Sequence, residues 1–275
     1  MEKYLIALDL DGTILYDFDS LSETLCEFMH KLQDLGHKIV IATGRPFRSS
    51  KFIYERFGLD TPIINYNGGL ITHPNDKNFK CVNYTVDKED IIDIFENNID
   101  HIRNAFSEVF DSIYLYREEK EIEPLLHVEG STDLIVGNLR DTLKSNTNGF
   151  IIIGKQGRGK IMKEYIDHKY KGKIKCRIWN ISGEFDSILE IFTPESNKGQ
   201  ALEYVANYLG FDREQIIAIG DGHNDIEMIQ YAKVGVCVRN AHPDLIKVAD
   251  IVLDYTSSEN AVYRFLSKYL TNNEK

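Results

Sequence analysis

Two carboxylates, Asp9 and Asp11, follow the first apolar run of the chain, which covers residues 4–8. The run indicates a buried, parallel strand, and Gly12 indicates the turn after it. Carboxylates in a buried sheet are costly unless a cation or phosphate chemistry compensates them. Spaced by one residue on a tight loop, they can reach one metal ion, with one acting as nucleophile and the other as an acid. Alternatively, they only solvate a strand end and Asp11-Gly12 is an ordinary turn.

Polar side chains also follow the other segments that resemble buried strands. Because ligands of open α/β sheets bind beyond the carboxyl ends of parallel strands, these side chains are expected to form one site. Lys198 opens a predicted helix, where its ammonium group and the free backbone N–H groups attract an anion. Together they supply carboxylates for a metal, and a hydroxyl and a lysine for a phosphate. The strand-end residues are Asp9, Asp11, Thr43, Asn67, Asp221, Asn224 and Asp225.

Strand-like and helix-like segments alternate along both ends of the chain. Apolar runs at residues 39–42, 62–65, 216–219, 234–238 and 251–253 indicate further strands. Helices are expected from Ser20 to Gly36, from Pro46, from Asn197 to Gly210, from Pro243 and over residues 258–270. This alternation predicts an α/β fold, a doubly wound, Rossmann-like core with a parallel sheet, made of residues 1–82 and 189–275.

Residues 83–188 have a different pattern. One helix-like segment at 87–99 is followed by strand-like segments at 113–116, 150–153, 175–179 and 188–191. Several of these alternate apolar with polar residues, as a half-exposed antiparallel sheet does. We therefore predict a second, α+β domain inserted into the first.

Composition limits the class of partner. The 275 residues carry 32 Lys and Arg against 43 Asp and Glu, a net charge of −11, which repels nucleic acid and anionic membranes. The apolar runs stay below the roughly 18 residues of a membrane-spanning helix, so we expect a cytoplasmic protein without a membrane partner. The four cysteines are scattered without a CxxC pair, which indicates buried or half-buried free thiols rather than zinc ligands or disulfides.

Four motifs resemble those of the haloacid dehalogenase-like phosphatase superfamily in order and spacing. They are DLDGT at 9–13, ATGR at 42–45, SNKGQAL at 196–202 and GDGHND at 220–225. The insertion between the second and third motifs looks like the large, C2-type cap of the Cof-type hydrolases. The resemblance spans the whole chain.

The resemblance assigns roles to individual residues. Asp9 would be the nucleophile that forms an aspartyl-phosphate, and Asp11 would protonate the leaving group and then activate water. Mg²⁺ would be held by Asp9, the Asp11 carbonyl and Asp221, with Asp225 as a further or water-mediated ligand. The expected phosphate- or substrate-binding residues are Gly12, Thr43, Gly44, Arg45, Asn67, Lys198 and Asn224.

The implied function is Mg²⁺-dependent hydrolysis of small phosphomonoesters, with the cap selecting among sugar phosphates, sugar alcohol phosphates and flavin or pyridoxal precursors. We expect a monomer or a weak homo-oligomer. The alternatives are a phosphotransferase or phosphomutase on the same core, and a non-catalytic protein that binds phosphorylated metabolites. A third alternative is a nucleotide site at residues 154–160, whose glycine and lysine spacing fits a P-loop, although Ile161 replaces its hydroxyl residue.

Several of these residues also have purely structural interpretations. Thr43 could cap the helix that begins near Pro46, and Lys198 could be a solvated lysine of a first helical turn. Asp221-Gly222 could be only a turn, and Asn224 only a helix cap. Arg45 could contact the substrate or pair with a surface carboxylate.

Overall fold

The structure is a computed structural model that describes residues 2–17, 19–179 and 185–272. The chain forms two units, one of residues 1–45, 50–82 and 197–275, the other of residues 46–49 and 83–196. The sequence placed the return to the first unit at residue 189. In the structure β11 (Ile188–Phe192) lies inside the sheet of the second unit, between β10 and β9, so that unit extends to Ser196.

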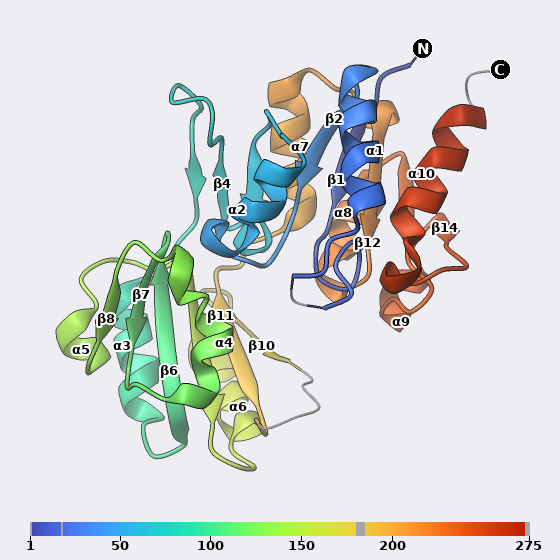
Figure 1. Cartoon of the computed structure of the whole chain (residues 1–275). Coiled ribbons are helices and arrows are strands. Elements are labelled where there is room, and N and C mark those ends of the chain that lie inside the picture. The colour runs from blue at the N-terminus through green and yellow to red at the C-terminus, as the bar shows by residue number, and fades with distance from the viewer. Residues whose placement is uncertain (1, 18, 180–184, 273–275) are drawn as a thin grey trace. The chain divides into compact units, whose positions relative to one another are not determined.

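A five-stranded parallel sheet forms the centre of the first unit, in the order β14-β13-β12-β1-β2. It confirms the predicted doubly wound core. Figure 1 shows α1 and α10 on the near side of this sheet, with α7 and α8 behind it. The strands are β1 (Leu5–Leu8), β2 (Lys38–Ile41), β12 (Ile216–Gly220), β13 (Val234–Cys237) and β14 (Ile251–Val252). The helices are α1 (Glu23–Asp34), α2 (Phe47–Arg56), α7 (Lys198–Leu209), α8 (Ile226–Tyr231), α9 (Pro243–Ile246) and α10 (Ala261–Asn272).

The ends of two helices show which capping signals the chain uses. The Asn197 side chain accepts a hydrogen bond from the backbone N–H of Gln200 and begins α7, which ends at Gly210 with φ 76°, as predicted. For α1 the expected cap at Ser20 was wrong. Ser22 is the cap, and its hydroxyl accepts from the Leu25 N–H at 3.4 Å.

The third expected strand joins the core in a different way. β3 (Ile63–Asn65) touches the parallel sheet through one bridge between Ala42 and Ile64, and then pairs antiparallel with β4 (Leu70–Thr72). β5 (Val82–Asn83) completes this three-stranded sheet. The turn between β3 and β4 carries part of the candidate site.

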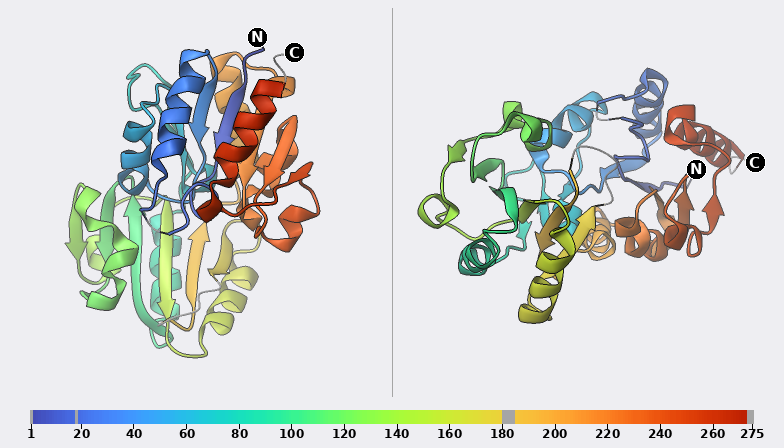
Figure 2. Two further views of the ribbon diagram at one scale, coloured as in Figure 1. Left: turned by 45° about the vertical axis from the view of Figure 1, so that its right-hand side comes forward. Right: turned by 90° about the horizontal axis from the view of Figure 1, so that it is seen from below.

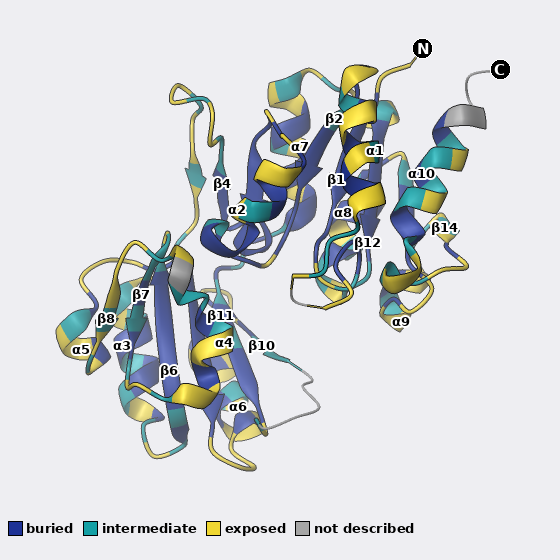
Figure 3. Cartoon of the chain, in the orientation of Figure 1, coloured by how far each residue is buried: buried dark blue, intermediate teal, exposed yellow. Residues whose placement is uncertain are grey.

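The second unit is built on a six-stranded sheet in the order β10-β11-β9-β6-β7-β8 (Figure 2). Its pairs are antiparallel except β7 with β8, which run parallel. One face packs against α3 and α6, and the other against α4, which gives two apolar clusters. The buried strands at its centre are dark blue in Figure 3. The strands are β6 (Ile102–Val109), β7 (Ser112–Leu115), β8 (Leu134–Val136), β9 (Gly149–Gly154), β10 (Lys175–Trp179) and β11. The helices are α3 (Lys88–Asn97), α4 (Glu123–Leu126), α5 (Leu139–Thr142) and α6 (Gly159–Lys169).

The four cysteines are free thiols, as predicted. Cys26, Cys176 and Cys237 are buried, whereas Cys81 is exposed, which corrects the expectation that all four would be at least half-buried. Among the described helices, none has the length and apolar character needed to cross a bilayer.

A buried ion pair ties residues 46–49 into the second unit. The Arg48 guanidinium pairs with the Glu108 carboxylate, and its Nε and one terminal nitrogen donate to the Leu126 carbonyl at 3.2 and 3.0 Å. The Asp111 carboxylate accepts from the Arg48 backbone N–H at 2.9 Å. Burial raises the pKa of Glu108, and the neighbouring guanidinium opposes that shift.

Replacing Arg48 with Met should strongly destabilise the second unit, because it leaves the Glu108 carboxylate buried without its cation. The expected loss in the free energy of unfolding is about 3 kcal/mol, measured by urea denaturation. Lys51→Met is the matched control on the same helix, since Lys51 forms only an exposed pair with Glu55. Its effect should stay within about 0.5 kcal/mol, and equal effects of the two substitutions would contradict the assignment.

Candidate active site

Three aspartates gather where β1 and β12 end. The Asp9 backbone N–H donates to the Ile219 carbonyl at 3.0 Å, which holds the end of β1 against β12. Asp221 follows β12 directly in the chain, and Asp225 lies four residues further on. Asp9, Asp221 and Asp225 each offer a carboxylate oxygen, and these oxygens lie within 4.8 Å of one another. The parallel register of the two strands therefore produces an acidic cluster from residues about 210 positions apart.

Lys198 lies at the centre of this cluster. Its Nζ donates to Asp9 Oδ1 and to Asp225 Oδ1, both at 2.6 Å, and all three side chains are buried. Lys198 is the first residue of α7, so the Asn197 cap fixes where the lysine side chain begins. The interpretation of Lys198 as a solvated lysine is wrong, because its side chain has no exposed surface.

Burial dominates the electrostatics of the cluster. It raises the pKa of Asp9 well above the usual range, with a further rise from Asp225, while Lys198 lowers it. Burial and the Asp225 charge raise the pKa of Asp221 to about 6. Burial alone would lower the pKa of Lys198, but the Asp225 and Asp9 charges outweigh it and the net shift is upward. A single ammonium group therefore does not compensate the crowded carboxylates.

Thr13 is a residue of this site that sequence reasoning missed. Its buried hydroxyl donates to Asp9 Oδ2 at 3.0 Å and lies 3.4 Å from Asp221 Oδ1. The sequence does contain a pattern that could have identified Thr13, because it is a hydroxyl residue four positions after Asp9 in the same turn. Thr13 and Lys198 thus hold the two different oxygens of Asp9.

Asp225 organises the loop after β12. Its Oδ2 accepts the backbone N–H groups of Asp221 and Gly222 at 3.0 and 2.8 Å, while its Oδ1 accepts from Lys198. Both oxygens are thus engaged within the protein. Asp225 positions Lys198 and the backbone of Asp221, in addition to any metal contact that the sequence analysis expected for it.

Asp11 points toward Arg45. The Arg45 guanidinium donates from Nε to Asp11 Oδ2 at 2.9 Å and from a terminal nitrogen to Oδ1 at 2.5 Å. Arg45 is buried, whereas the Asp11 side chain is 57% exposed. The sequence left open whether Arg45 contacts a substrate or a surface carboxylate, and in the structure it orients Asp11 through a bidentate pair.

Thr43 lies fully buried at the end of β2. Its hydroxyl oxygen accepts the Arg45 backbone N–H at 3.1 Å, which forms a turn ahead of α2 rather than a cap on a helical N–H, because α2 begins at Phe47. Accepting this bond does not use the hydroxyl hydrogen, so Thr43 retains a donor. Its backbone carbonyl accepts from the Asn67 N–H at 2.9 Å.

Asn67 and Asn224 meet across the turn after β3. The Asn224 amide donates to the Asn67 side-chain oxygen at 2.8 Å. The turn is unusual, because Tyr66, Asn67 and Gly68 have φ values of 49°, 54° and 96°. Left-handed conformations of this kind cost energy at non-glycine residues and concentrate at functional sites. A Cβ at Gly68 would lie 2.5 Å from the Asn197 carbonyl oxygen, so this turn approaches the start of α7 closely.

The loop over residues 154–160 belongs to the second unit. It connects β9 to α6, and the Gly157 N–H donates to the Asp186 carboxylate at 2.8 Å. A carboxylate of the chain itself thus takes one of the backbone donors that a P-loop presents to phosphate. The Lys160 side chain is mostly exposed and lies near Glu164. This geometry argues against a nucleotide site there.

The acidic cluster fits a divalent cation. Carboxylate oxygens are the donors that hard cations such as Mg²⁺ prefer. With all groups ionised, three carboxylates and one ammonium sum to −3 + 1 = −2, which one dication balances. Asp225 is the least available of the three, because its oxygens already accept three hydrogen bonds, one from Lys198 and two from backbone N–H groups, whereas each Asp9 oxygen accepts one side-chain hydrogen bond.

The chain matches a family model described as haloacid dehalogenase-like hydrolase over residues 6–266. It is 32% identical to the 5-amino-6-(5-phospho-D-ribitylamino)uracil phosphatase YitU of Bacillus subtilis, with 98% of each chain covered. A second B. subtilis protein of that description, YcsE, is 29% identical, with 97% of this chain and 95% of YcsE covered. A solved haloacid dehalogenase-like hydrolase from Bacteroides thetaiotaomicron superposes with a TM-score of 0.84 at 22% identity, covering 98% of this chain and 100% of its own.

Gly12 tests whether the acidic cluster binds Mg²⁺. Its φ is 75°, and a Cβ there would lie 2.2 Å from Asp221 Oδ2. If the cluster binds Mg²⁺, the ion should raise the melting temperature of the parent protein, and Gly12→Ala should remove that rise because it displaces the Asp221 carboxylate.

Gly210→Ala is the matched control. Its φ is 76°, but no atom lies within 4 Å of the added Cβ. It should cost about 1 kcal/mol of stability and keep the full response to Mg²⁺. If both variants kept that response, Asp221 would not be a metal ligand.

Proposed function

We propose that this chain, which belongs to the haloacid dehalogenase-like hydrolase family and is a phosphatase, hydrolyses small phosphomonoesters with Asp9 as the nucleophile. One observation carries the proposal, the Asp9 carboxylate held by Lys198 at one oxygen and by Thr13 at the other. A carboxylate fixed in this way loses little freedom when it attacks phosphorus. Lys198 also neutralises part of the charge that would otherwise repel an anionic phosphate.

The reaction would have two steps. An Asp9 oxygen bonds to phosphorus as the ester oxygen leaves with a proton from Asp11, which forms an aspartyl-phosphate. Asp11 then accepts a proton from the water that hydrolyses this intermediate, so inorganic phosphate leaves and both aspartates return to their starting states. Bound Mg²⁺ would supply positive charge at the attacked phosphoryl group.

Arg45 would hold Asp11 as the carboxylate that accepts the proton from water, and Asp11 would leave this contact to carry the proton that it donates to the leaving group. The bidentate contact fixes both carboxylate oxygens, and Arg45 itself is held by the Thr43 hydroxyl at its backbone N–H. The phosphoryl oxygens would be met by the Thr43 hydroxyl, the Gly44 N–H, Lys198 and the Asn224 amide. An added Cβ at Gly44 would lie 3.2 Å from the Asn67 amide atoms, so a larger residue would crowd the loop that carries this N–H.

For the substrate, we propose a phosphorylated ribitylamino-pyrimidine. Two relatives that align over nearly their whole length, YitU and YcsE, are described as phosphatases of 5-amino-6-(5-phospho-D-ribitylamino)uracil. The identity of 32% to YitU spans both units, so it includes the insertion expected to select the leaving group.

The first test measures release of inorganic phosphate from 5-amino-6-(5-phospho-D-ribitylamino)uracil, with Mg²⁺ or with chelator and without an acceptor sugar. The parent protein should turn over only with Mg²⁺, and Asp9→Asn should lower kcat about a thousandfold or more. Asp34→Asn, an exposed position at the end of α1, is the control with the same charge change. Substrate binding without release of phosphate would instead support a phosphotransferase or a binding protein.

The second test compares leaving groups at a common phosphate ester. The value of kcat/KM for 5-amino-6-(5-phospho-D-ribitylamino)uracil should exceed that for ribitol 5-phosphate by about ten- to a hundredfold, because the ring adds binding energy at the transition state. Ribitol 5-phosphate is the control, since it keeps the ester and the polyol chain. Equal values would reject the pyrimidine preference and leave the phosphatase assignment intact.

A further inference from the structure

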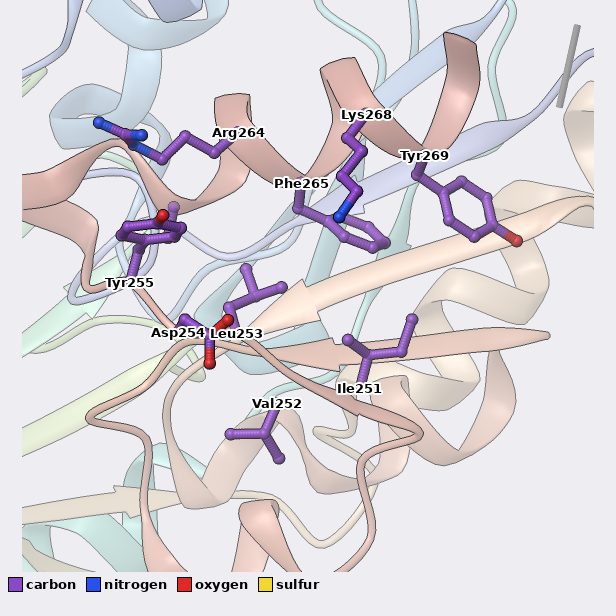
Figure 4. Close-up of a pocket in the computed structure, with 10 residues that line it drawn as sticks. Ile251, Val252, Leu253, Asp254, Tyr255, Arg264, Phe265, Lys268 and Tyr269 are labelled. Carbon is purple, nitrogen blue, oxygen red and sulfur yellow. The ribbon is translucent and has the colours of Figure 1, made fainter. Parts of the chain in front are cut away.

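The first unit carries a cavity of about 350 Å³ whose lining residues are all distinct from those of the active site (Figure 4). It lies between the edge strand β14, the loop that follows β14, and one face of α10. The volume falls within the range of pockets that bind small molecules. Its lining residues are Ile251, Val252, Leu253, Asp254, Tyr255, Ala261, Arg264, Phe265, Lys268 and Tyr269.

The helix presents two different faces. Its buried face comprises Val262, Leu266 and Leu270, which pack into the core. The residues that line the cavity fall at positions 261, 264, 265, 268 and 269, the spacing of a second stripe along one side of a helix. This second stripe combines aromatic rings with two cations. It therefore offers both an apolar wall and charge to one ligand.

The apolar wall suits a planar ring. Phe265 and Tyr269 lie with ring centroids 5.2 Å apart, tilted by 33°. Ile251 and Leu253 face them from the strand side in Figure 4. Aromatic pairs of this kind favour an offset or edge-on ring as a partner.

The polar groups select an anion. The Arg264 guanidinium lies 4.6 Å from the Tyr255 ring centroid, and its Nε donates to the Glu259 carbonyl at 2.9 Å, so its position is fixed. Figure 4 shows the Lys268 ammonium extending from α10 toward the strand, beside the Phe265 ring. Asp254 is the one carboxylate among the lining residues. The lining therefore carries a net positive charge on a chain whose total charge is −11.

We propose that this cavity is a second binding site, for a small planar aromatic anion. The ring would pack against Leu253 and Phe265, and the anionic group would pair with Lys268, while Arg264, turned toward Tyr255, adds to the positive charge of the lining. The proposal does not depend on the phosphatase assignment, because the two sites have no residue in common.

The probe is 1-anilinonaphthalene-8-sulfonate, an aromatic anion, titrated into protein with labelled Ile, Leu and Val methyl groups. The largest NMR shifts should occur at Ile251 and Leu253, whose side chains face α10. Lys268→Glu should weaken the affinity about five- to tenfold, because it replaces an attractive charge with a repulsive one. Lys31→Glu is the matched control, an exposed lysine near the end of another helix of the same unit.

A neutral probe separates charge from apolar packing. N-phenyl-1-naphthylamine has the same rings without the sulfonate, so it should bind more weakly than the anion and respond little to Lys268→Glu. Unchanged affinity of the anionic probe in Lys268→Glu would overturn the proposal. So would methyl shifts concentrated away from β14, or concentration-dependent self-association through α10 without probe shifts there. Melting curves check that each variant is folded.

Discussion

The buried contact between Lys198 and the two aspartates, Asp9 and Asp225, is the interaction on which the site depends. An ammonium group removed from water is stable only with close anionic partners, and here it has two at 2.6 Å. The same contact fixes three elements, because Asp9 ends β1, Lys198 begins α7 and Asp225 follows β12. Loss of the lysine would leave three carboxylates together without a cation. A substitution of Lys198 would therefore change both the stability of the fold and the charge of the site.

The parallel sheet explains why such distant residues meet. Adjacent parallel strands bring their carboxyl ends to one edge, and β1 lies between β2 and β12 in the sheet. Residues after each of these strands therefore converge, with Asp9 and Thr13 from β1, Thr43 from β2 and Asp221 from β12. The turn after β3 adds Asn67 through backbone conformations that only a few residue types tolerate. The sheet brings these residues close together, and the turns after the strands set the directions of their side chains.

Sequence reasoning identified the residues at strand ends because a carboxylate after an apolar run is a local signal. It could not identify contacts that depend on side-chain direction. The bidentate pair of Arg45 with Asp11, and Thr13 between two aspartates, follow from how turns fold in three dimensions. It also missed the strands β6 and β8. It predicted β11 as a strand but placed its end in the wrong unit, because an apolar run does not indicate which sheet the strand joins. The Ser22 cap shows that two capping residues two positions apart cannot be ranked from spacing alone.

The connection between the two units places a constraint on Asp11. Arg45 belongs to the first unit and orients Asp11, whereas residues 46–49 belong to the second unit, where Arg48 is buried against Glu108. Three residues of chain span at most about 11 Å, so the distance between the backbones of Arg45 and Arg48 cannot exceed that length. Any displacement of the first turn of α2 must be absorbed within that span or passed to Arg45. The residue that holds Asp11 is thus covalently close to an ion pair in the core of the second unit. Lys198, which holds Asp9, lies as near to the other connection, two residues after Ser196, so the side chains that hold both aspartates follow or precede a crossing between the units directly in the chain.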